Sequence, residues 1–150
     1  MIEVNHVTFH YNEQEEQDTP PALRDVSLRI HEGETIAIIG HNGSGKSTLA
    51  RLLTALLRPS SGTITVDGIS TEADGEDLWT IRQRVGLVFQ NPDDQIVANT
   101  VIDDVAFGPE NLGLPRPEIV ERIQEALVLL DLEPYAEMNI SDLSIGQKQR

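Results

Sequence analysis

The chain has 150 residues, enough for one ordinary domain with a buried core. Its 11 Lys and Arg residues against 25 Asp and Glu residues give a formal net charge of -14, which opposes sequence-independent binding to nucleic acid. Cysteine is absent, which excludes disulfides and thiolate metal sites. No segment resembles a secretion signal or reaches the roughly 20 apolar residues of a membrane span, so we expect a cytoplasmic chain.

The first part of the chain predicts two strands joined by a polar loop. Residues 2–11 are rich in β-branched and aromatic side chains, and residues 22–30 alternate apolar with polar side chains. The loop between them carries an acidic cluster and then two prolines, namely Glu13, Glu15, Glu16, Asp18, Pro20 and Pro21. We interpret this loop as a solvated connection.

A strand, a glycine-rich loop and a helix are predicted next. Residues 35–40 (TIAIIG) are almost wholly apolar and β-branched, which is typical of a central strand covered on both faces of a parallel sheet. Residues 46–57 carry leucines at helical spacing, so they predict a helix that ends before Pro59.

The remaining pattern indicates an α/β core followed by helices. Strands over residues 62–67 and 85–90 flank a short helix over residues 77–84, which is the alternation of an α/β protein. Helices are then predicted over residues 101–112 and 118–132. We place a soft boundary near Asn91, so we expect an α/β core at residues 1–91 and a helical subdomain at residues 92–150.

Residues 40–48 (GHNGSGKST) match the pattern G-x-x-x-x-G-K-[ST] between the apolar strand and the helix. Glycines let several backbone N–H groups surround an anion, and the helix start adds partial positive charge. Lys46 would bridge the β- and γ-phosphates, Ser47 would bind Mg2+, and Thr48 could reach another phosphate oxygen. The predicted nucleotide-binding residues are Gly40, His41, Asn42, Gly43, Ser44, Gly45, Lys46, Ser47 and Thr48.

A plainer interpretation of the same residues is a glycine-rich turn whose lysine only opens a helix. We interpret His41, which lies inside the loop, as a tolerated spacer rather than a catalyst. The position of the loop between a strand and a helix favours binding of a nucleoside triphosphate.

Two further segments carry a family resemblance. VFQNPDDQ at residues 88–95 and LSIGQ at residues 143–147 follow the phosphate loop, and together with it they resemble the Q-loop and signature sequence of ATP-binding cassette (ABC) ATPases. More narrowly, NPDDQ followed by DDVAFGPENLGLP at residues 103–115 resembles the ATPase subunits of energy-coupling factor (ECF) transporters. The resemblance implies an α/β P-loop NTPase fold with an N-terminal antiparallel β subdomain and a helical subdomain.

The resemblance also implies roles for Tyr11 and Gln90, with ATP and Mg2+ as cofactors. Tyr11 matches the aromatic position that stacks on adenine. Gln90 could ligate Mg2+ or its water through the amide oxygen and, with Lys46, contribute to catalysis. The alternatives are a strand-end aromatic residue and an ordinary strand-terminal glutamine.

Ser144, Gly146 and Gln147 match the signature sequence, which implies contact in trans with the γ-phosphate held by a partner subunit. Ile145 stands where the family usually has a second glycine, and its branched side chain restricts how closely the backbone approaches the phosphate. The alternative is a plain serine-capped helix.

Asp93, Asp94 and Gln95 lie in the region that in the family meets the coupling helices of the transmembrane subunit. Basic residues on that partner would complement this patch. The alternative is a polar turn opened by Asn91 and Pro92.

The resemblance thus implies the ATP-binding subunit of an ECF-type importer of a vitamin or metal ion, peripheral at the cytoplasmic face of the cell membrane. Its partners would be a second ABC ATPase subunit in a homo- or heterodimer, a transmembrane coupling subunit and a substrate-binding membrane subunit, with no nucleic acid. The alternatives are a non-catalytic nucleotide-binding or regulatory fragment and a soluble ABC ATPase acting on nucleic acid.

The second half of an ABC site consists of the Walker B strand, the catalytic Glu and the switch His. None of these three features follows Gln147 in this sequence. We therefore expect an N-terminal portion that binds nucleotide weakly and does not hydrolyse it alone, because the water-orienting carboxylate is worth several orders of magnitude in rate. We also expect exposed apolar flanks at Ile36, Ile38 and Ile39, which would lack a neighbouring strand.

Overall fold

The structure is a computed structural model that describes residues 1–12 and 19–150. The acidic loop residues Glu13, Glu15, Glu16 and Asp18 lie outside the described residues. The chain divides into two compact units, Met1–Leu87 and Val88–Arg150, and each is described by itself below.

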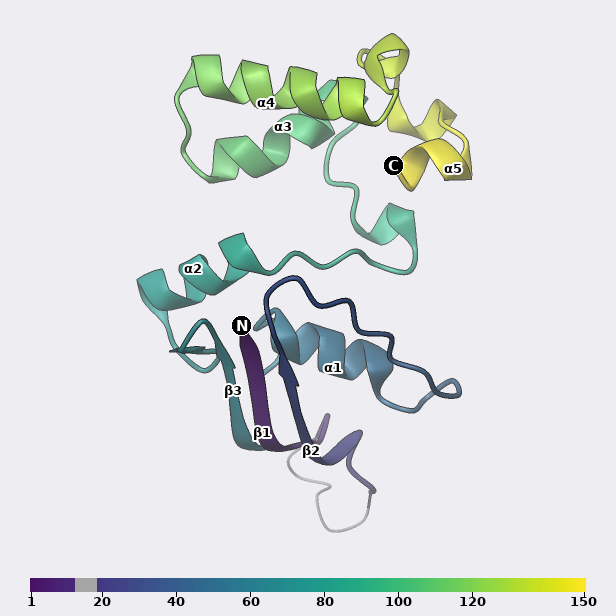
Figure 1. The fold of residues 1–150 in the computed structure, drawn as a ribbon. Helices are drawn as coiled ribbons and strands as arrows, with labels where there is room; N and C mark the ends of the chain where they lie inside the picture. The colour runs from purple at the N-terminus through teal and green to yellow at the C-terminus, as the bar shows by residue number, and fades with distance from the viewer. Residues whose placement is uncertain (13–18) are drawn as a thin grey trace. The chain divides into compact units, whose positions relative to one another are not determined.

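An antiparallel sheet forms the framework of the first unit (Figure 1). In the described residues its strands are β1 (Ile2–Phe9), β2 (Leu23–Ile30), β3 (Ser61–Val66) and β4 (Ile69–Ser70), in the order β2-β1-β3-β4. The prediction of strands in these first three regions is confirmed. Only β4 was not anticipated, because two residues show no periodicity.

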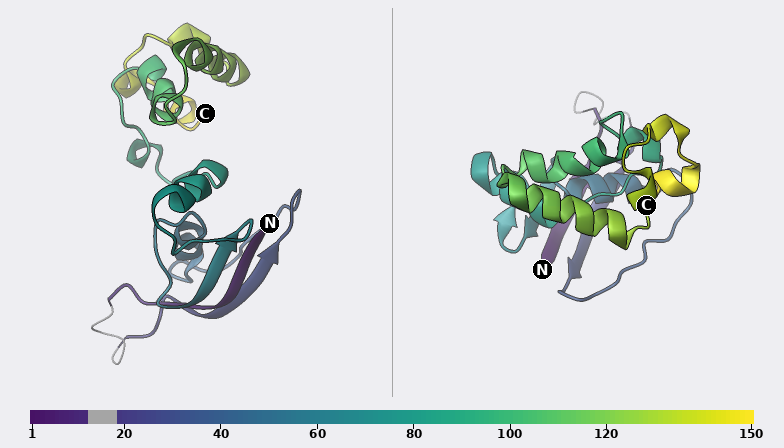
Figure 2. Two further views of the ribbon diagram at one scale, coloured as in Figure 1. Left: turned by 90° about the vertical axis from the view of Figure 1, so that its left-hand side faces the viewer. Right: turned by 90° about the horizontal axis from the view of Figure 1, so that it is seen from above.

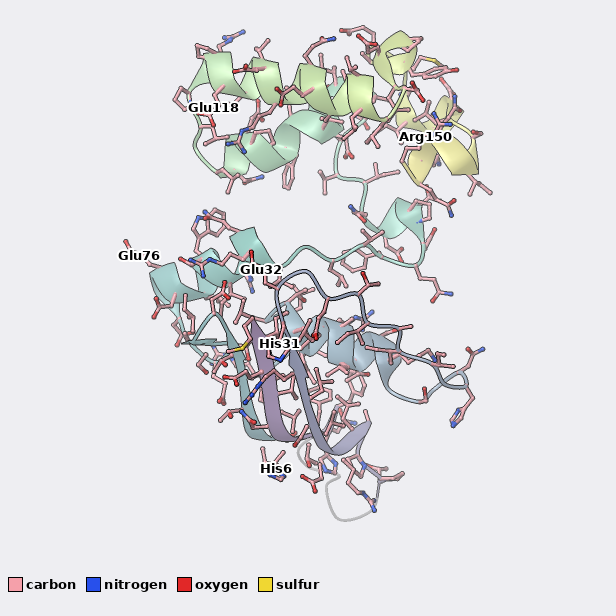
Figure 3. The ribbon with its side chains drawn as sticks, viewed as in Figure 1. His6, His31, Glu32, Glu76, Glu118 and Arg150 are labelled. Carbon is pink, nitrogen blue, oxygen red and sulfur yellow. The ribbon has the colours of Figure 1, made fainter. Side chains whose placement is uncertain are left out.

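A bulge in β1 keeps its apolar side chains on one face. Val4, Val7 and Phe9 are all buried, although strict alternation would place Val4 and Val7 on opposite faces. The pairing register shifts between Val4 and Val7, and His6 there has a φ of 49°. The His6 ring, labelled in Figure 3, lies at this bulge in β1, where Nδ1 is 2.7 Å from Oδ1 of Asp25.

The turn between β3 and β4 ties the N-terminus to the sheet. Asp67 and Gly68 have φ values of 48° and 82°, as the two central residues of a tight hairpin require. The N-terminal ammonium of Met1 and then Arg84 lower the pKa of the Asp67 carboxyl. The resulting stabilisation is present above the ordinary aspartate pKa and is lost as the pH falls through the lowered value.

Two helices cover the sheet of the first unit. The helix α1 (Lys46–Leu53) lies against one face of the sheet (Figure 2), and its Leu49 and Leu52 are buried there. They pack with apolar side chains of the sheet, namely Val4, Val7, Phe9, Leu23 and Ile64. The helix α2 (Gly75–Arg84) contributes Ile81 to a second cluster with Ala55 and Val66.

Three predicted boundaries or elements in this region were wrong. The helix predicted over residues 46–57 ends at Leu53, because the chain turns at Ala55, whose φ is 53°. The segments 35–40 and 85–90 carry a strand pattern, but the structure assigns them no strand. A strand is stable only within a ladder of hydrogen bonds, and the described residues provide no neighbouring strand for either segment.

The second unit is helical. Its main helices are α3 (Val101–Asn111) and α4 (Arg116–Leu129), which lie side by side in both views of Figure 2. Short helical turns follow the chain around them, namely η2 (Pro92–Asp94), η3 (Glu133–Tyr135), η4 (Ile140–Asp142) and α5 (Ile145–Lys148). The predicted helices at residues 101–112 and 118–132 are thus confirmed, with shifted ends.

Buried apolar residues join the helices of the second unit. Val101 and Ala106 of α3 contact Ile123 and Leu127 of α4, and Leu132 extends this core. The Thr100 side chain caps α3 by accepting a hydrogen bond from the backbone N–H of Asp103. On the outer face of α4, Glu118, labelled in Figure 3, pairs with Arg122 at 2.7 Å. None of the described helices is long and apolar enough to cross a membrane.

We predict that Leu52→Ala lowers the free energy of unfolding of the first unit by about 2–5 kcal/mol, because Leu52 is fully buried and its removal leaves a cavity. Leu56→Ala is the matched control, since this leucine is 48% exposed. Its cost should be about 1 kcal/mol at most. Urea unfolding of both variants checks the difference, and equal losses would contradict the placement of α1 on the sheet.

Candidate nucleotide-binding site

Residues 40–45 form the loop that leads into α1, and its glycines adopt backbone conformations that other residues avoid. Gly43 and Gly45 have φ values of 82° and 88°. Gly45 also approaches β2 closely: a Cβ placed there would lie 2.6 Å from the carbonyl oxygen of Ala22 and 2.7 Å from Cδ2 of Leu23. The start of α1 is therefore held against the start of β2 by a contact that only glycine allows.

The ammonium group of Lys46 lies at the centre of this loop. Its Nζ donates hydrogen bonds of 2.8 Å to the carbonyl oxygens of both Gly40 and His41, and it lies 3.4 Å from Oγ of Ser44. In this structure the partners of Nζ are thus oxygen atoms of the loop itself. The sequence pattern had predicted phosphate oxygens as its partners. A bound polyphosphate would replace these carbonyls as the partner of Nζ, and charge-assisted bonds to it are the stronger ones.

The structure brings Tyr11 to the start of α1. Its hydroxyl lies 2.9 Å from Oγ1 of Thr48, a residue 37 positions away, and its ring packs edge-on against Phe9 with 5.0 Å between centroids. Tyr11 remains 59% exposed while Thr48 is 6% exposed. The predicted base-binding and phosphate-binding residues of the first unit therefore lie together.

Three other loop residues face solvent. His41, Asn42 and Ser47 are all exposed. Nδ1 of His41 lies 2.8 Å from the carbonyl oxygen of Asn42, a local contact that fits the interpretation of His41 as a spacer. Ser47, the predicted ligand for Mg2+, is thus open to solvent.

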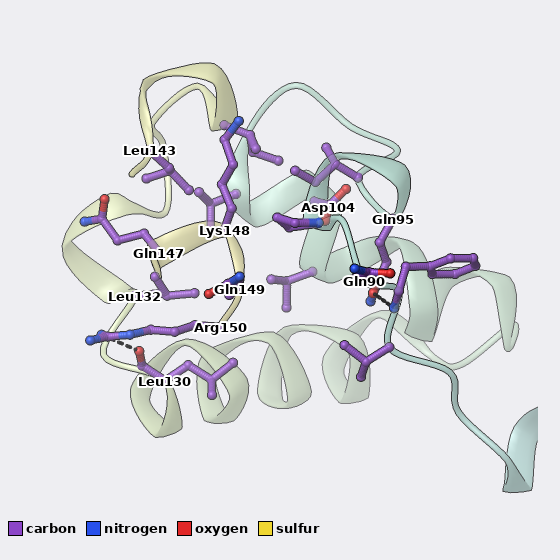
Figure 4. A pocket seen from close by; sticks show the side chains of 17 residues that line it. Gln90, Gln95, Asp104, Leu130, Leu132, Leu143, Gln147, Lys148, Gln149 and Arg150 are labelled. Carbon is purple, nitrogen blue, oxygen red and sulfur yellow. Dashed lines mark hydrogen bonds between the residues drawn. The ribbon is translucent and has the colours of Figure 1, made fainter. Parts of the chain in front are cut away.

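The remaining predicted site residues lie in the second unit. Gln90, Gln95 and Gln147 line a pocket of about 430 Å³ (Figure 4). Lys148 also lines it, and its Nζ pairs with Oδ1 of Asp93 at 2.8 Å. The segments around residues 90–95 and 147–148 thus meet within one unit. The Lys148–Asp93 pair could not be predicted from the sequence, because its members are 55 positions apart.

The polar patch after Gln90 is partly occupied by contacts of its own segment. Besides the Asp93 pair, Oδ1 of Asp94 accepts a 3.3 Å hydrogen bond from Asn91, and the side-chain oxygen of Gln95 accepts one of 3.4 Å from the N–H of Phe89. Asp94 remains exposed and has no counter-ion among the described residues.

Ser144 caps α5 with a reciprocal pair of contacts. The N–H of Gln147 donates to Oγ of Ser144, while the side-chain oxygen of Gln147 accepts from the Ser144 N–H at 2.9 Å. The helix start expected at Ser144 is therefore present. The Ile145 side chain is 72% exposed, and a Cβ at Gly146 would meet nothing within 4 Å, so the backbone around Gly146 is open on that side.

The described residues include no group of three or more His, Cys, Asp or Glu side chains arranged for a metal ion. The predicted magnesium ligands, Ser47 and Gln90, offer one hydroxyl and one amide oxygen. They belong to different units, Ser47 to the first and Gln90 to the second, so a Mg2+ ion shared by the two residues stays a prediction.

The fold and the glycine-rich loop match those of the nucleotide-binding domains of ABC ATPases. A family model described as ABC transporter matches residues 23–150, and the chain therefore belongs to the ABC transporter family. A curated relative is the energy-coupling factor transporter ATP-binding protein EcfA1 of Enterococcus faecalis, 52% identical over 150 residues. The protein of the same name from Caldanaerobacter subterraneus is 51% identical over the same length.

The chain spans about half the length of these curated relatives, 52% and 53% respectively, while each match covers all of this chain. The expected resemblance to ECF ATP-binding subunits is confirmed by these identities.

Solved structures confirm the fold class. CbiO1 from Clostridium perfringens, part of the ABC transporter complex cbiONQ, is 35% identical with a TM-score of 0.81, and the match covers 99% of this chain and 57% of that one. The ATP-binding cassette MJ0796, as a post-hydrolysis dimer bound to ADP and Pi, is 32% identical with a TM-score of 0.83, covering 99% and 65%.

We predict that Gly45→Ala destabilises the first unit more than Gly43→Ala. Both substitutions place an alanine at a positive φ, which costs about 1–2 kcal/mol. Only the Gly45 variant also forces a Cβ against the backbone of Ala22, for a further cost of about 1–3 kcal/mol. Thermal unfolding of the two variants tests this ranking, and an equal or larger loss for Gly43→Ala would refute the close approach.

Proposed function

We propose that this chain provides the ATP-binding part of an ECF-type ABC importer. The observation that supports this most is the position of Lys46, whose ammonium donates to two carbonyls of a loop with positive-φ glycines at the start of α1. Such a loop binds the polyphosphate tail of a nucleotide through backbone N–H groups and one cation. The similarity to ECF ATP-binding proteins supports ATP as the nucleotide.

Within this proposal, each loop residue has a chemical role. Lys46 contacts the β- and γ-phosphates, Ser47 binds Mg2+, and Thr48 contacts a further phosphate oxygen. Tyr11 provides a ring for adenine, and Gln90 supplies an amide oxygen to Mg2+ or its water. The loop residues Gly40, His41, Asn42, Gly43, Ser44 and Gly45 supply the surrounding backbone.

A second ATPase subunit would complete the site. The signature residues Ser144, Gly146 and Gln147 would contact the nucleotide held by that subunit, and the open backbone at Gly146 supports such an approach. A dimeric structure of the similar cassette MJ0796 supports pairing of two subunits. The assembly would lie at the cytoplasmic face of the membrane with a transmembrane coupling subunit and a substrate-binding subunit, and would drive uptake of a vitamin or metal ion.

We predict that Lys46→Ala weakens binding of Mg-ATP by about 10- to 150-fold, because a hydrogen bond to a charged group is worth roughly 1.5–3 kcal/mol. The matched control is Arg51→Ala, which removes one positive charge from the exposed side of the same helix. Isothermal titration calorimetry gives both dissociation constants.

The control separates a specific site from general attraction. Arg51→Ala should bind Mg-ATP within about twofold of the unmodified chain, since exposed charges are screened by salt. Equal losses in the two variants would show that only net charge matters. A folded, unmodified chain that gives no heat beyond dilution would refute the proposal.

The patch Asp93, Asp94 and Gln95 is proposed to contact basic residues of the transmembrane subunit. We predict that Asp94→Lys lowers recovery of the complex when the subunits are co-expressed and purified, because like charges oppose each other at an interface. Glu121→Lys, an equal charge reversal on the exposed face of α4, is the control and should leave recovery unchanged. Equal recovery of the complex with both variants would show that the patch does not contribute to the interface.

A further inference from the structure

The hydrogen bond between Tyr11 and Thr48 joins a residue assigned to the base with a residue assigned to the phosphates. The two oxygens are 2.9 Å apart, and the bond is part-buried. Stacking on adenine needs only the flat face of an aromatic ring, so it leaves the tyrosine hydroxyl without a function. The placement of that hydroxyl on Thr48 therefore calls for a separate explanation.

The chemistry of the ligand fixes the direction of this bond. Phosphate oxygens only accept hydrogen bonds, so the side chain of Thr48 can contact one only by donating its single hydroxyl hydrogen. Its oxygen still has lone pairs that accept a hydrogen bond. Tyr11 then has to be the donor, and the order becomes Tyr11 O–H to Thr48 Oγ1, and Thr48 O–H to phosphate.

A second threonine of the same region shows the usual alternative. The Thr54 hydroxyl donates to backbone carbonyls of the preceding turn, those of Ala50 at 3.3 Å and Arg51 at 3.1 Å. In the part of the chain that the structure describes, the Thr48 hydroxyl instead pairs with Tyr11. Its hydrogen is thus not committed to a carbonyl of the helix, and either oxygen of the Tyr11–Thr48 pair can donate when no phosphate is bound.

The Tyr11 ring is anchored well enough to hold this geometry. It packs edge-on against Phe9, at 84° between ring planes, and Phe9 is 6% exposed within the core. Thr48 is itself buried beside Leu49 at the start of α1. The donor and the acceptor are therefore both positioned before any ligand arrives, which lowers the entropy cost of binding.

We propose that Tyr11 is a positioning residue for the polyphosphate tail: its hydroxyl donates to Thr48 and so directs the Thr48 hydrogen to a phosphate oxygen. This inference rests on the proposed nucleotide site. It adds that Tyr11 acts on the phosphates as well as on the base. The ligand class is a polyphosphate anion, and the effect does not require adenine.

Inorganic tripolyphosphate with Mg2+ separates the two actions of Tyr11, because it has no base. Tyr11→Phe keeps the ring and removes only the donor, so it should weaken binding of Mg-ATP and of Mg-tripolyphosphate by the same factor, about 2- to 12-fold for one hydrogen bond. Tyr135→Phe, the same change at the other tyrosine, should alter neither. Calorimetric titration and thermal unfolding of each variant provide the measurements.

A double-mutant cycle tests the path through Thr48. Thr48→Val should weaken both ligands at least as much as Tyr11→Phe, and adding Tyr11→Phe to Thr48→Val should cause no further loss. Thr48→Ser keeps a hydroxyl and should retain most of the affinity. Additive losses in the double variant would overturn the inference.

Two further outcomes would also overturn it. Unchanged tripolyphosphate affinity in Tyr11→Phe would mean that the ring alone acts, and tighter binding would mean that the hydroxyl competes with the ligand for Thr48. In both cases the unmodified chain still binds Mg-ATP, so the proposed function stands. A folded chain that binds neither ligand refutes the proposed function and this inference together.

Discussion

The contact between Gly45 and the start of β2 is the constraint on which the nucleotide-binding unit depends. A side chain at residue 45 would collide with the carbonyl of Ala22 and with Leu23. Because α1 begins at the next residue and buries Leu52 in the sheet, this contact sets where the helix start lies. The glycine-rich loop therefore leads directly into a packed core, which is what the proposed preorganised binding site requires.

Elements with strong periodicity could be predicted from the sequence. The strands β1, β2 and β3 and the helices α1 to α4 all fall where alternating or helical patterns place them. Their ends could not be predicted as well, because tertiary contacts decide them. The helix α1 stops at Leu53, although leucines continue at helical spacing, since Ala55 turns with a positive φ and joins the cluster of Val66 and Ile81.

The two predicted central strands show the limit of a hydrophobic pattern. Such a pattern records that a segment avoids water, but it does not supply the neighbour that completes a hydrogen-bond ladder. Without such a neighbour in the described residues, Ile36 and Ile38 are nearly half exposed and Ile39 is 92% exposed. The expectation of exposed apolar flanks at these residues is confirmed, even though the strand itself was predicted wrongly.

Site residues were predictable to different degrees for a similar reason. The phosphate loop is contiguous, so its spacing alone indicates the chemistry. The contacts Tyr11–Thr48 and Lys148–Asp93 join residues 37 and 55 positions apart, and only the folded chain reveals them.

The net charge of -14 affects a long ligand and a short ligand differently. A long nucleic acid needs many cations along its binding surface, so an acidic surface opposes its binding. A short ligand responds mainly to nearby charges, because salt screens exposed charges beyond about 8 Å. A short polyphosphate tail needs only one ammonium and a few N–H groups, so the role proposed for Lys46 and its loop is compatible with an acidic protein.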